Sequence, residues 1–308
     1  MIPMLAKNRL IPNSLIVLAI IASSGGCRSI RNIGESRNSM AARRISRQGI
    51  QAMQQGRTEV AEQLFSNALE ISDSDDRAHR GMAESLWQRN KQVEAIAHME
   101  QAVTLSAGDP KLILRLGEMY HEVGRIREAD QKSREALAAD QSSAQAWSLR
   151  GKCLLATRQY EDALAAYHQA LAIQPDFHEA QFQTAEIYRI QGRYDRLLAT
   201  LDCSSESLPT NETPARTDVL RAIALQELGR PTDSLKSLES AVQKDPQNVE
   251  TRLMIASASL QSGNLELAEE SIAIANQLDP AAVKRGEWIR QLQASQNRLA
   301  SATTNEIR

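Results

Sequence analysis

Apolar and polar residues follow the spacing of amphipathic helices along most of the chain. In the stretch 144–177 the apolar residues return every three or four positions, and polar residues occupy the places between them. That spacing collects apolar side chains on one face of a helix. The smallest residues of the stretch, Gly151, Ala163 and Ala170, stand where a single amphipathic helix would carry large ones. The pattern therefore predicts helices that pack closely against other helices.

The small residues recur every 34 residues. Three columns hold Gly49, Ala83, Gly117, Gly151 and Ala185; Ala61, Ala95, Ala129 and Ala163; and Ala68, Ala102, Ala136 and Ala170. A fourth column holds Gly56, Asn90, Gly124, Arg158 and Gly192. After an insertion of three residues the phase returns with Ala222 and Ala256, Ser234 and Ala268, Ala241 and Ala275, and Gly229 and Gly263.

The 34-residue period and these columns resemble the tetratricopeptide repeat (TPR) family. The resemblance covers residues 42–282, and the fourth unit matches the family pattern at Trp147, Gly151, Leu154, Tyr160, Ala163, Tyr167, Ala170 and Pro175. The resemblance predicts seven repeats of two helices each, at residues 42–75, 76–109, 110–143, 144–177, 178–211, 215–248 and 249–282. The expected fold is all-α: a right-handed α-solenoid in which no repeat buries its apolar face without its neighbours.

Each repeat is expected to consist of two antiparallel helices. The fourth column ends the first helix in the left-handed conformation, which Gly adopts freely, Asn tolerates and Arg158 suits less well. The small columns lie where helix axes cross closely. Pro175, Pro209, Pro246 and Pro280 close four repeats. Residues 283–299, with Trp288, Ile289, Leu292 and Leu299 on one side, are expected to cap the array, and residues 300–308 to form a flexible tail.

The fifth repeat departs from the pattern in its second half. Ser204, Ser205 and Ser207 replace apolar residues there, and the insertion follows directly. One interpretation makes residues 202–214 a flexible joint within the array. The other is a locally degenerate repeat that its neighbours hold in place.

The N-terminus has the features of an export signal. Lys7 and Arg9 precede an apolar segment whose uninterrupted part, residues 15–22, is too short to span a bilayer. Ser24, Gly25, Gly26 and Cys27 resemble the lipobox of bacterial lipoproteins, with Ser24 where Leu is usual. The resemblance implies cleavage of residues 1–26, lipid on Cys27, and a repeat array held at a membrane of the bacterial cell envelope, in the periplasm or outside. The alternatives are an ordinary signal peptide with a cysteine nearby, or an uncleaved anchor.

Charge is uneven along the chain. The chain of 308 residues has a net charge of −2, but residues 28–57 carry seven arginines against Glu35. We expect residues 27–41 to form a basic linker. This basic region could touch anionic lipid head groups, or it could be a solvated linker that its charges keep extended.

Candidate chemistry is sparse. The near-neutral charge does not favour nucleic acid as a partner. The three cysteines are too scattered for a disulfide framework or a zinc site, and the five histidines lack metal-binding spacing. The sequence contains no phosphate-binding loop, dinucleotide-binding motif or nucleophile elbow. We therefore expect no cofactor, no metal and no catalytic activity.

The family resemblance implies a partner site instead. In TPR proteins the first helices line a concave groove, and residues at set positions face a protein or peptide ligand. When these family positions are applied to this sequence, the expected groove residues are Arg77, Arg80, Glu84, Trp87, Lys111, Leu114, Glu118, His121, Phe182, Glu186, Arg189 and Ile223. Trp87 is either an anchor among charges or a residue packed on its own repeat. The Asn of the family's carboxylate clamp is absent at the ninth position of every repeat, so that clamp is not expected.

Two functions fit these expectations. The first is an envelope scaffold that binds a protein or peptide partner during envelope assembly. The second is an accessory subunit of an envelope enzyme or transporter whose catalytic chain is separate.

Overall fold

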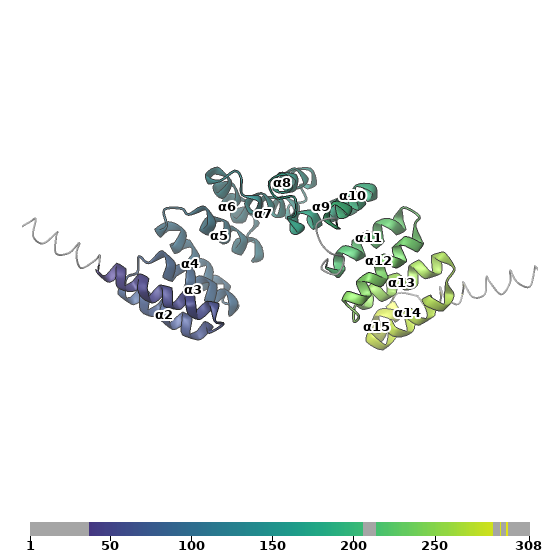
Figure 1. Cartoon of the computed structure of the whole chain (residues 1–308), viewed down its shortest axis with the longest axis horizontal. Coiled ribbons are helices and arrows are strands. Elements are labelled where there is room, and N and C mark those ends of the chain that lie inside the picture. Colours follow the sequence, from purple (N-terminus) through teal and green to yellow (C-terminus); the bar gives the residue numbers. More distant parts are fainter. Residues whose placement is uncertain (1–36, 206–213, 286–289, 291–293, 295–308) are drawn as a thin grey trace, which may run out of the picture. The chain divides into compact units, whose positions relative to one another are not determined.

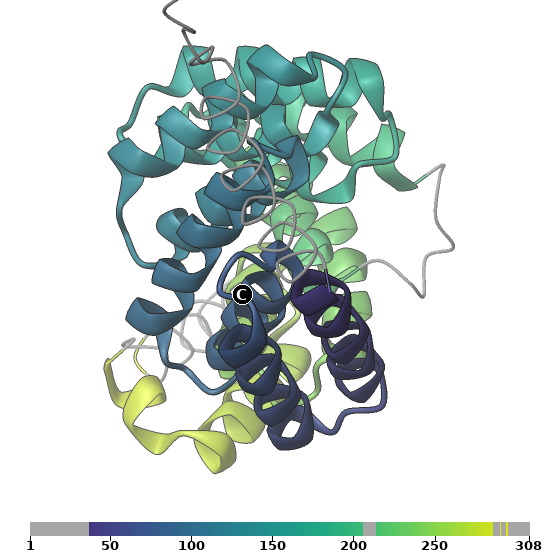
Figure 2. The same cartoon turned by 90° about the vertical axis from the view of Figure 1, so that its left-hand side faces the viewer.

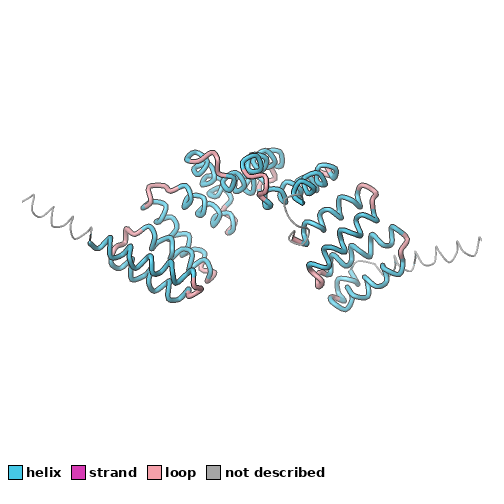
Figure 3. Tube along the Cα trace, in the orientation of Figure 1, coloured by secondary structure: helices cyan, strands magenta, loops and turns pink. Residues whose placement is uncertain are grey.

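The computed structural model describes residues 37–205, 214–285, 290 and 294. It divides into an N-terminal body, residues 1–135, and a C-terminal body, residues 136–308, which are described separately. Among the described residues every regular element is a helix, and short loops join successive helices (Figures 1 and 3). The all-α repeat fold expected from the sequence is confirmed.

The helices of the N-terminal body alternate between the two halves of the repeats. The N-terminal helix occupies residues 37–54. It is followed by α2 (Thr58–Ile71), α3 (Asp76–Gln88), α4 (Gln92–Leu105), α5 (Pro110–Glu122) and α6 (Ile126–Ala139), the last of which continues into the C-terminal body. We call the helix that opens each repeat its leading helix, and the second one its trailing helix.

The C-terminal body continues the same alternation. Its leading helices are α7 (Ala144–Ala156), α9 (His178–Ile190), α11 (Ala215–Glu227) and α13 (Val249–Ser262). Its trailing helices are α8 (Tyr160–Ile173), α10 (Tyr194–Ser205), α12 (Pro231–Lys244) and α14 (Leu265–Leu278), and α15 (Pro280–Arg285) follows. Within each body, helices that are consecutive in sequence from α2 to α5 and from α7 to α15 pack side by side, both within a repeat and from one repeat to the next (Figures 1 and 2).

The turn between the two helices of a repeat has the predicted left-handed residue. Positive φ angles between 60° and 78° occur at Gly56, Asn90, Gly124, Arg158, Gly192, Gly229 and Gly263. At Gly124, for example, the turn closes with hydrogen bonds from the Gly124 N–H to the His121 carbonyl (3.0 Å) and from the Arg125 N–H to the Tyr120 carbonyl (2.8 Å). This backbone geometry ends the leading helix and sends the chain back along it.

The small columns lie in the core, as the sequence predicted. Ala61, Ala83 and Ala163 are completely buried. Gly151 faces the ring of Tyr167, and a Cβ added at Gly151 would lie 2.7 Å from Tyr167 Cε1. Real Cβ atoms do not approach so closely, so the glycine allows the aromatic ring of the trailing helix to pack on the leading helix.

A further buried column lies beside the small ones and holds a large apolar or aromatic residue in six of the seven repeats. Its members occupy the same position of each trailing helix and are buried in every repeat: Phe65, Met99, Ser133, Tyr167, Leu201, Leu238 and Ile272. In the third repeat this position holds a serine, whose hydroxyl donates to the Asp130 carbonyl one turn earlier in α6 (2.7 Å). The repeats are therefore built on one plan with side chains of different volume.

The described part of the structure changes two of the expected boundaries. Residues 37–41 are helical rather than part of a linker. The physical reason is the sequence Met40–Arg44, which consists of strong helix formers without a breaker before Gly49. The final helix α15 begins at Pro280 rather than at 283. Proline suits the first turn of a helix, and the Asp279 side chain accepts a hydrogen bond from the Ala281 N–H (2.9 Å).

Several expectations fall outside the described residues. They are the signal and lipidation segment 1–27, residues 206–213 of the proposed joint, most of the proposed cap and the tail 300–308. None of the described helices is both long enough and apolar enough to cross a membrane.

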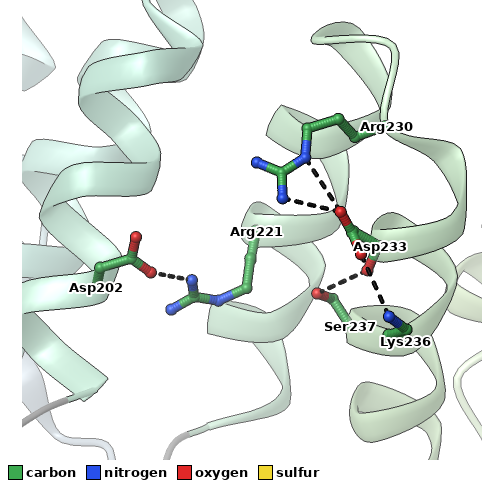
Figure 4. Close-up of polar contacts among 6 residues, drawn as sticks. All are labelled: Asp202, Arg221, Arg230, Asp233, Lys236 and Ser237. Atoms are coloured by element: carbon green, nitrogen blue, oxygen red, sulfur yellow. Dashed lines mark hydrogen bonds and ion pairs between the residues drawn. The ribbon is translucent and has the colours of Figure 1, made fainter.

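The helices on either side of residues 206–213 contact each other. One buried cluster of the C-terminal body includes Leu201 of α10 together with Leu220 and Ala224 of α11. Arg221 of α11 also forms an ion pair with Asp202 (Figure 4). The same guanidinium donates to the Leu201 carbonyl (3.1 Å). The array therefore keeps a shared core next to the insertion.

Candidate partner-binding surface

The predicted groove residues lie on leading helices in both bodies. In the N-terminal body α3 carries Arg77, Arg80, Glu84 and Trp87, and α5 carries Lys111, Leu114, Glu118 and His121. In the C-terminal body α9 carries Phe182, Glu186 and Arg189, and α11 carries Ile223. All twelve side chains are exposed or half-buried.

The N-terminal body brings part of this set together around one arginine. Arg115 of α5 makes a two-pronged ion pair with Glu84 of α3, with Nε–Oε1 and Nη2–Oε2 distances of 2.8 and 3.0 Å. Its Nη1 atom lies 3.4 Å from Glu118 and 3.7 Å from Glu122. The hydrogen bonds to Glu84 raise the pKa of the half-buried Arg115 guanidinium. We call these four residues, together with Trp87, the Arg115 cluster.

Trp87 lies beside this arginine. The guanidinium carbon of Arg115 is 5.8 Å from the centre of the Trp87 ring, within the range of a cation–π contact. Trp87 is half-buried, and the contact comes from the leading helix of the next repeat. Trp87 therefore contacts the next repeat, and its role as an anchor for a partner stays a prediction.

Three cations lie near the N-terminal ends of α3 and α5. Arg77, Arg80 and Lys111 are exposed, and none has an ion-pair partner among the described residues. The acidic members of the Arg115 cluster lie further along the same helices. The surface of the N-terminal body therefore offers separate positive and negative regions to a partner.

The C-terminal body has a related cluster around Glu179 of α9. Lys152 of α7 and Arg216 of α11 approach this carboxylate from the neighbouring helices, at 3.6 and 3.4 Å. The Arg216 guanidinium also stacks over the Phe182 ring, 4.1 Å from its centre. Burial opposes ionisation of Glu179, but the hydrogen bond from Gln183 and the two positive charges outweigh it and lower the Glu179 pKa.

The remaining predicted residues of the C-terminal body do not join this cluster. Glu186 pairs with Arg189 one turn along α9 at 2.7 Å, and Ile223 is half-buried on α11. The predicted set omitted Arg115, Lys152, Glu179 and Arg216, each of which links two repeats. Their signal was present in the sequence as charges of opposite sign on consecutive leading helices.

The described residues show no metal centre. Within them, no three His, Cys, Asp or Glu side chains converge in a way that could hold a metal ion. The interactions that these clusters display are charge pairing and aromatic contact between neighbouring repeats.

Comparison with known families agrees with the repeat geometry. Tetratricopeptide repeat models match residues 46–110, 89–153, 144–177 and 225–286. Together these matches span more than half of the chain. The chain belongs to the tetratricopeptide repeat family. TPR proteins generally bind protein partners, and the family and fold are typically non-catalytic.

Two curated relatives are similar to parts of this TPR chain. Cellulose synthase operon protein C of Pseudomonas fluorescens is 26% identical over 237 residues, which are 72% of this chain and 18% of the relative. Mouse tetratricopeptide repeat protein 21A is 21% identical over 147 residues, 48% of this chain and 11% of the relative. The chain thus spans less than a fifth of the length of either protein.

Solved TPR structures have the same fold. A tetratricopeptide repeat protein from Parabacteroides merdae has a TM-score of 0.60 and 14% identity, covering 82% of this chain and 99% of that one. PilF from Pseudomonas aeruginosa has a TM-score of 0.62 and 17% identity, covering 73% and 99%. At these identities the similarity is one of fold.

Proposed function

We propose that this TPR chain is a non-catalytic scaffold that binds a protein or peptide partner through its leading helices during assembly of the bacterial envelope. The Arg115 cluster is the observation that carries the proposal. It presents a half-buried Trp and a half-buried Arg, two of the residue types that dominate the binding energy of protein interfaces. The exposed Arg77, Arg80 and Lys111 lie on the same helices and supply charges that a partner can pair.

The proposed location is a membrane of the envelope, through lipid on Cys27. The support is the order of sequence features: positive charges, a short apolar segment, small residues and a cysteine. Cells fed labelled palmitate should label the chain, and Cys27→Ala should abolish the label and release the protein from the membrane. An unlabelled, soluble wild-type protein would reject the anchor.

Copurification from the native cells tests the partner surface. The variants Trp87→Ala and Arg115→Ala should lose the partner, because they remove the aromatic group and the charge at the centre of the cluster. Arg89→Ala is the matched control, because Arg89 directly follows α3 and pairs with Glu62 of α2 (2.5 Å) outside the cluster. Thermal unfolding of each variant checks that the repeats remain folded. Retention of every partner by folded Trp87→Ala and Arg115→Ala would reject this surface.

A second function has a specific observation in its favour. The similarity to cellulose synthase operon protein C covers 72% of the chain and favours an accessory subunit of an envelope enzyme or transporter whose catalytic chain is separate. The same copurification separates the two functions. Structural envelope proteins in the eluate favour the scaffold, whereas a stoichiometric enzyme or transporter chain favours the accessory subunit.

A further inference from the structure

The N-terminal helix presents a basic face to solvent. Residues 37–54 contain four arginines and no acidic residue. Arg37, Arg43, Arg44 and Arg47 are all exposed, and none of them has an ion-pair partner among the described residues. Residues three, four or seven positions apart share one side of a helix, so the four guanidinium groups project from one side.

Packing fixes the direction in which this side points. The opposite side of the helix is buried through Ala42, Ser46, Gly49 and Ala52. Ala42 packs in one apolar cluster with Ala68 of α2 and Ala78 of α3. The Ser46 hydroxyl lies 2.9 Å from the Asp75 carboxylate, to which it donates. The arginines are therefore held on a folded element and are not carried by an extended linker.

The acids seen beside this helix lie away from the arginines. The Asp75 carboxylate is buried against Ser46, on the packed side of the helix. Glu70 and Asp73 line a surface pocket together with Asn38. At 100° per residue, Asn38 points well away from Arg37, Arg44 and Arg47. The basic face therefore keeps its positive potential. Its centre holds Met40, an apolar side chain that is 60% exposed.

We propose that this basic face binds the anionic surface of a phospholipid membrane. Clustered arginines beside an exposed apolar side chain match a layer of anionic head groups over hydrocarbon. The face begins ten residues after Cys27, a distance of at most about 35 Å for an extended chain. The choice of a membrane as the occupant rests on the lipid anchor of the proposed function. Nucleic acid is disfavoured because residues 58–308 carry a net charge of −10.

Vesicle binding by the full chain tests this inference. Because the apolar N-terminal segment can bind lipid by itself, the quantity to measure is the ratio of affinities for two kinds of vesicle. One kind contains about one third phosphatidylglycerol in phosphatidylcholine, and the other contains phosphatidylcholine alone. We expect a ratio well above one at 0.1 M salt that falls steeply as salt is raised.

The variant Arg37→Gln/Arg43→Gln/Arg44→Gln/Arg47→Gln should lower this ratio by roughly 100-fold or more, since each arginine near an anionic surface contributes about fivefold. The matched control Arg127→Gln/Arg134→Gln/Arg158→Gln/Lys236→Gln removes the same charge from exposed positions elsewhere and should change the ratio little. Oxidation of Met40 by dilute peroxide should slow on anionic vesicles in the wild type.

Three outcomes would overturn the inference. The first is an unchanged ratio in the folded quadruple variant, and the second is an equal loss in the control. The third is arginine-dependent binding to a DNA duplex without any such binding to anionic vesicles. The lipid anchor fails separately, through the absence of palmitate labelling.

Discussion

At the residue scale, the smallest side chains specify how closely the two helices of a repeat approach. Gly151 of α7 lies against the fully buried Tyr167 ring of α8, and Gly49 lies on the Phe65 ring of its own repeat in the same way. Gly81 of the second repeat packs on the other side of the boundary between repeats, also against the Phe65 ring. A glycine at such a site has no side chain, and the aromatic ring of the neighbouring helix occupies the space that a side chain would fill. The core of each repeat is therefore set by pairs of positions and not by single residues.

We expect Gly151→Ala to destabilise the protein by about 1–3 kcal/mol, because the new methyl group must displace the Tyr167 ring from a packed core. Denaturant unfolding measures the loss. The double variant Gly151→Ala/Tyr167→Leu should recover part of it, since the smaller side chain makes room for the methyl group. If the single variant unfolds like the wild type, the close contact between these two helices is absent.

Arg158 offers the opposite test. It has a φ of 60° without being glycine, and it has no ion-pair partner among the described residues. Arg158→Gly should stabilise the protein by about 0.5–1 kcal/mol, because glycine removes the steric cost of the left-handed conformation. Asn90→Gly should gain less, since asparagine tolerates the same φ of 60°. Equal gains in the free energy of unfolding from both variants would show that arginine and asparagine have the same steric cost in this turn.

At the scale of the element, polar contacts join helices that the apolar pattern already pairs. His79 of α3 and His98 of α4 face each other with their Nδ1 atoms 3.0 Å apart. His79 Nε2 lies 3.0 Å from the Asp73 carbonyl. A carbonyl can only accept, so His79 donates through Nε2 and accepts at Nδ1 from the His98 N–H. The bond between the two rings exists only while Nδ1 of His79 carries no proton, because a protonated nitrogen cannot accept.

The stability of the N-terminal body should therefore depend on pH. Burial, and next the charge of His79, lower the His98 pKa, and the carboxylate of Glu94 only partly opposes them. The folded state then binds fewer protons than the unfolded state near pH 6. This contribution is complete above the unfolded histidine pKa of about 6.5 and is lost as the pH falls below it.

The variant His98→Gln tests this dependence. Its free energy of unfolding should fall less than that of the wild type between pH 7.5 and pH 5.5, because the titrating group is gone. Hydrogen exchange in α4 gives a local measure of the same change. Parallel pH profiles for the two proteins would mean that the histidine pair does not contribute.

At the scale of the whole molecule, a repeat array is stabilised by its units and by the interfaces between neighbours. The insertion after α10 interrupts the 34-residue period, and the fifth and sixth repeats meet beside it. Two arginines of this region, both labelled in Figure 4, have different kinds of partner. Arg221 pairs with Asp202 of the preceding repeat, whereas Arg230 pairs with Asp233 within the first turn of α12 (2.8 Å).

We expect Arg221→Met to weaken the coupling between the fifth and sixth repeats. Amides of α10 should exchange faster in the variant, while those of α8 keep their rates. The effect should be no more than about 1 kcal/mol, because Asp202 is well exposed and solvent screens the pair. Arg230→Met is the matched control and should leave α10 unchanged. An equal response to both variants would assign the effect to lost charge and not to the contact between repeats.

Much of this architecture could be predicted from the sequence, because its causes are local. A 34-residue period, a left-handed residue at Asn90 or Gly124 and an alanine such as Ala163 at a helix crossing each reflect backbone sterics or side-chain volume. Such properties belong to single residues and recur with the period. They were sufficient to predict the helical repeats, the turn residues and the buried small columns.

Only the tertiary structure decided which side chains meet. Arg115 joins Glu84 and Trp87, Arg216 stacks on Phe182, and Arg221 reaches Asp202, each across a boundary between repeats. A long arginine side chain can reach several neighbours on adjacent helices. Which neighbour the arginine contacts depends on its rotamer and on the local offset of one repeat against the next. The 34-residue period of the sequence specifies neither. The sequence by itself therefore determined the repeating backbone plan, and the packing of neighbouring repeats determined the charged and aromatic clusters on it.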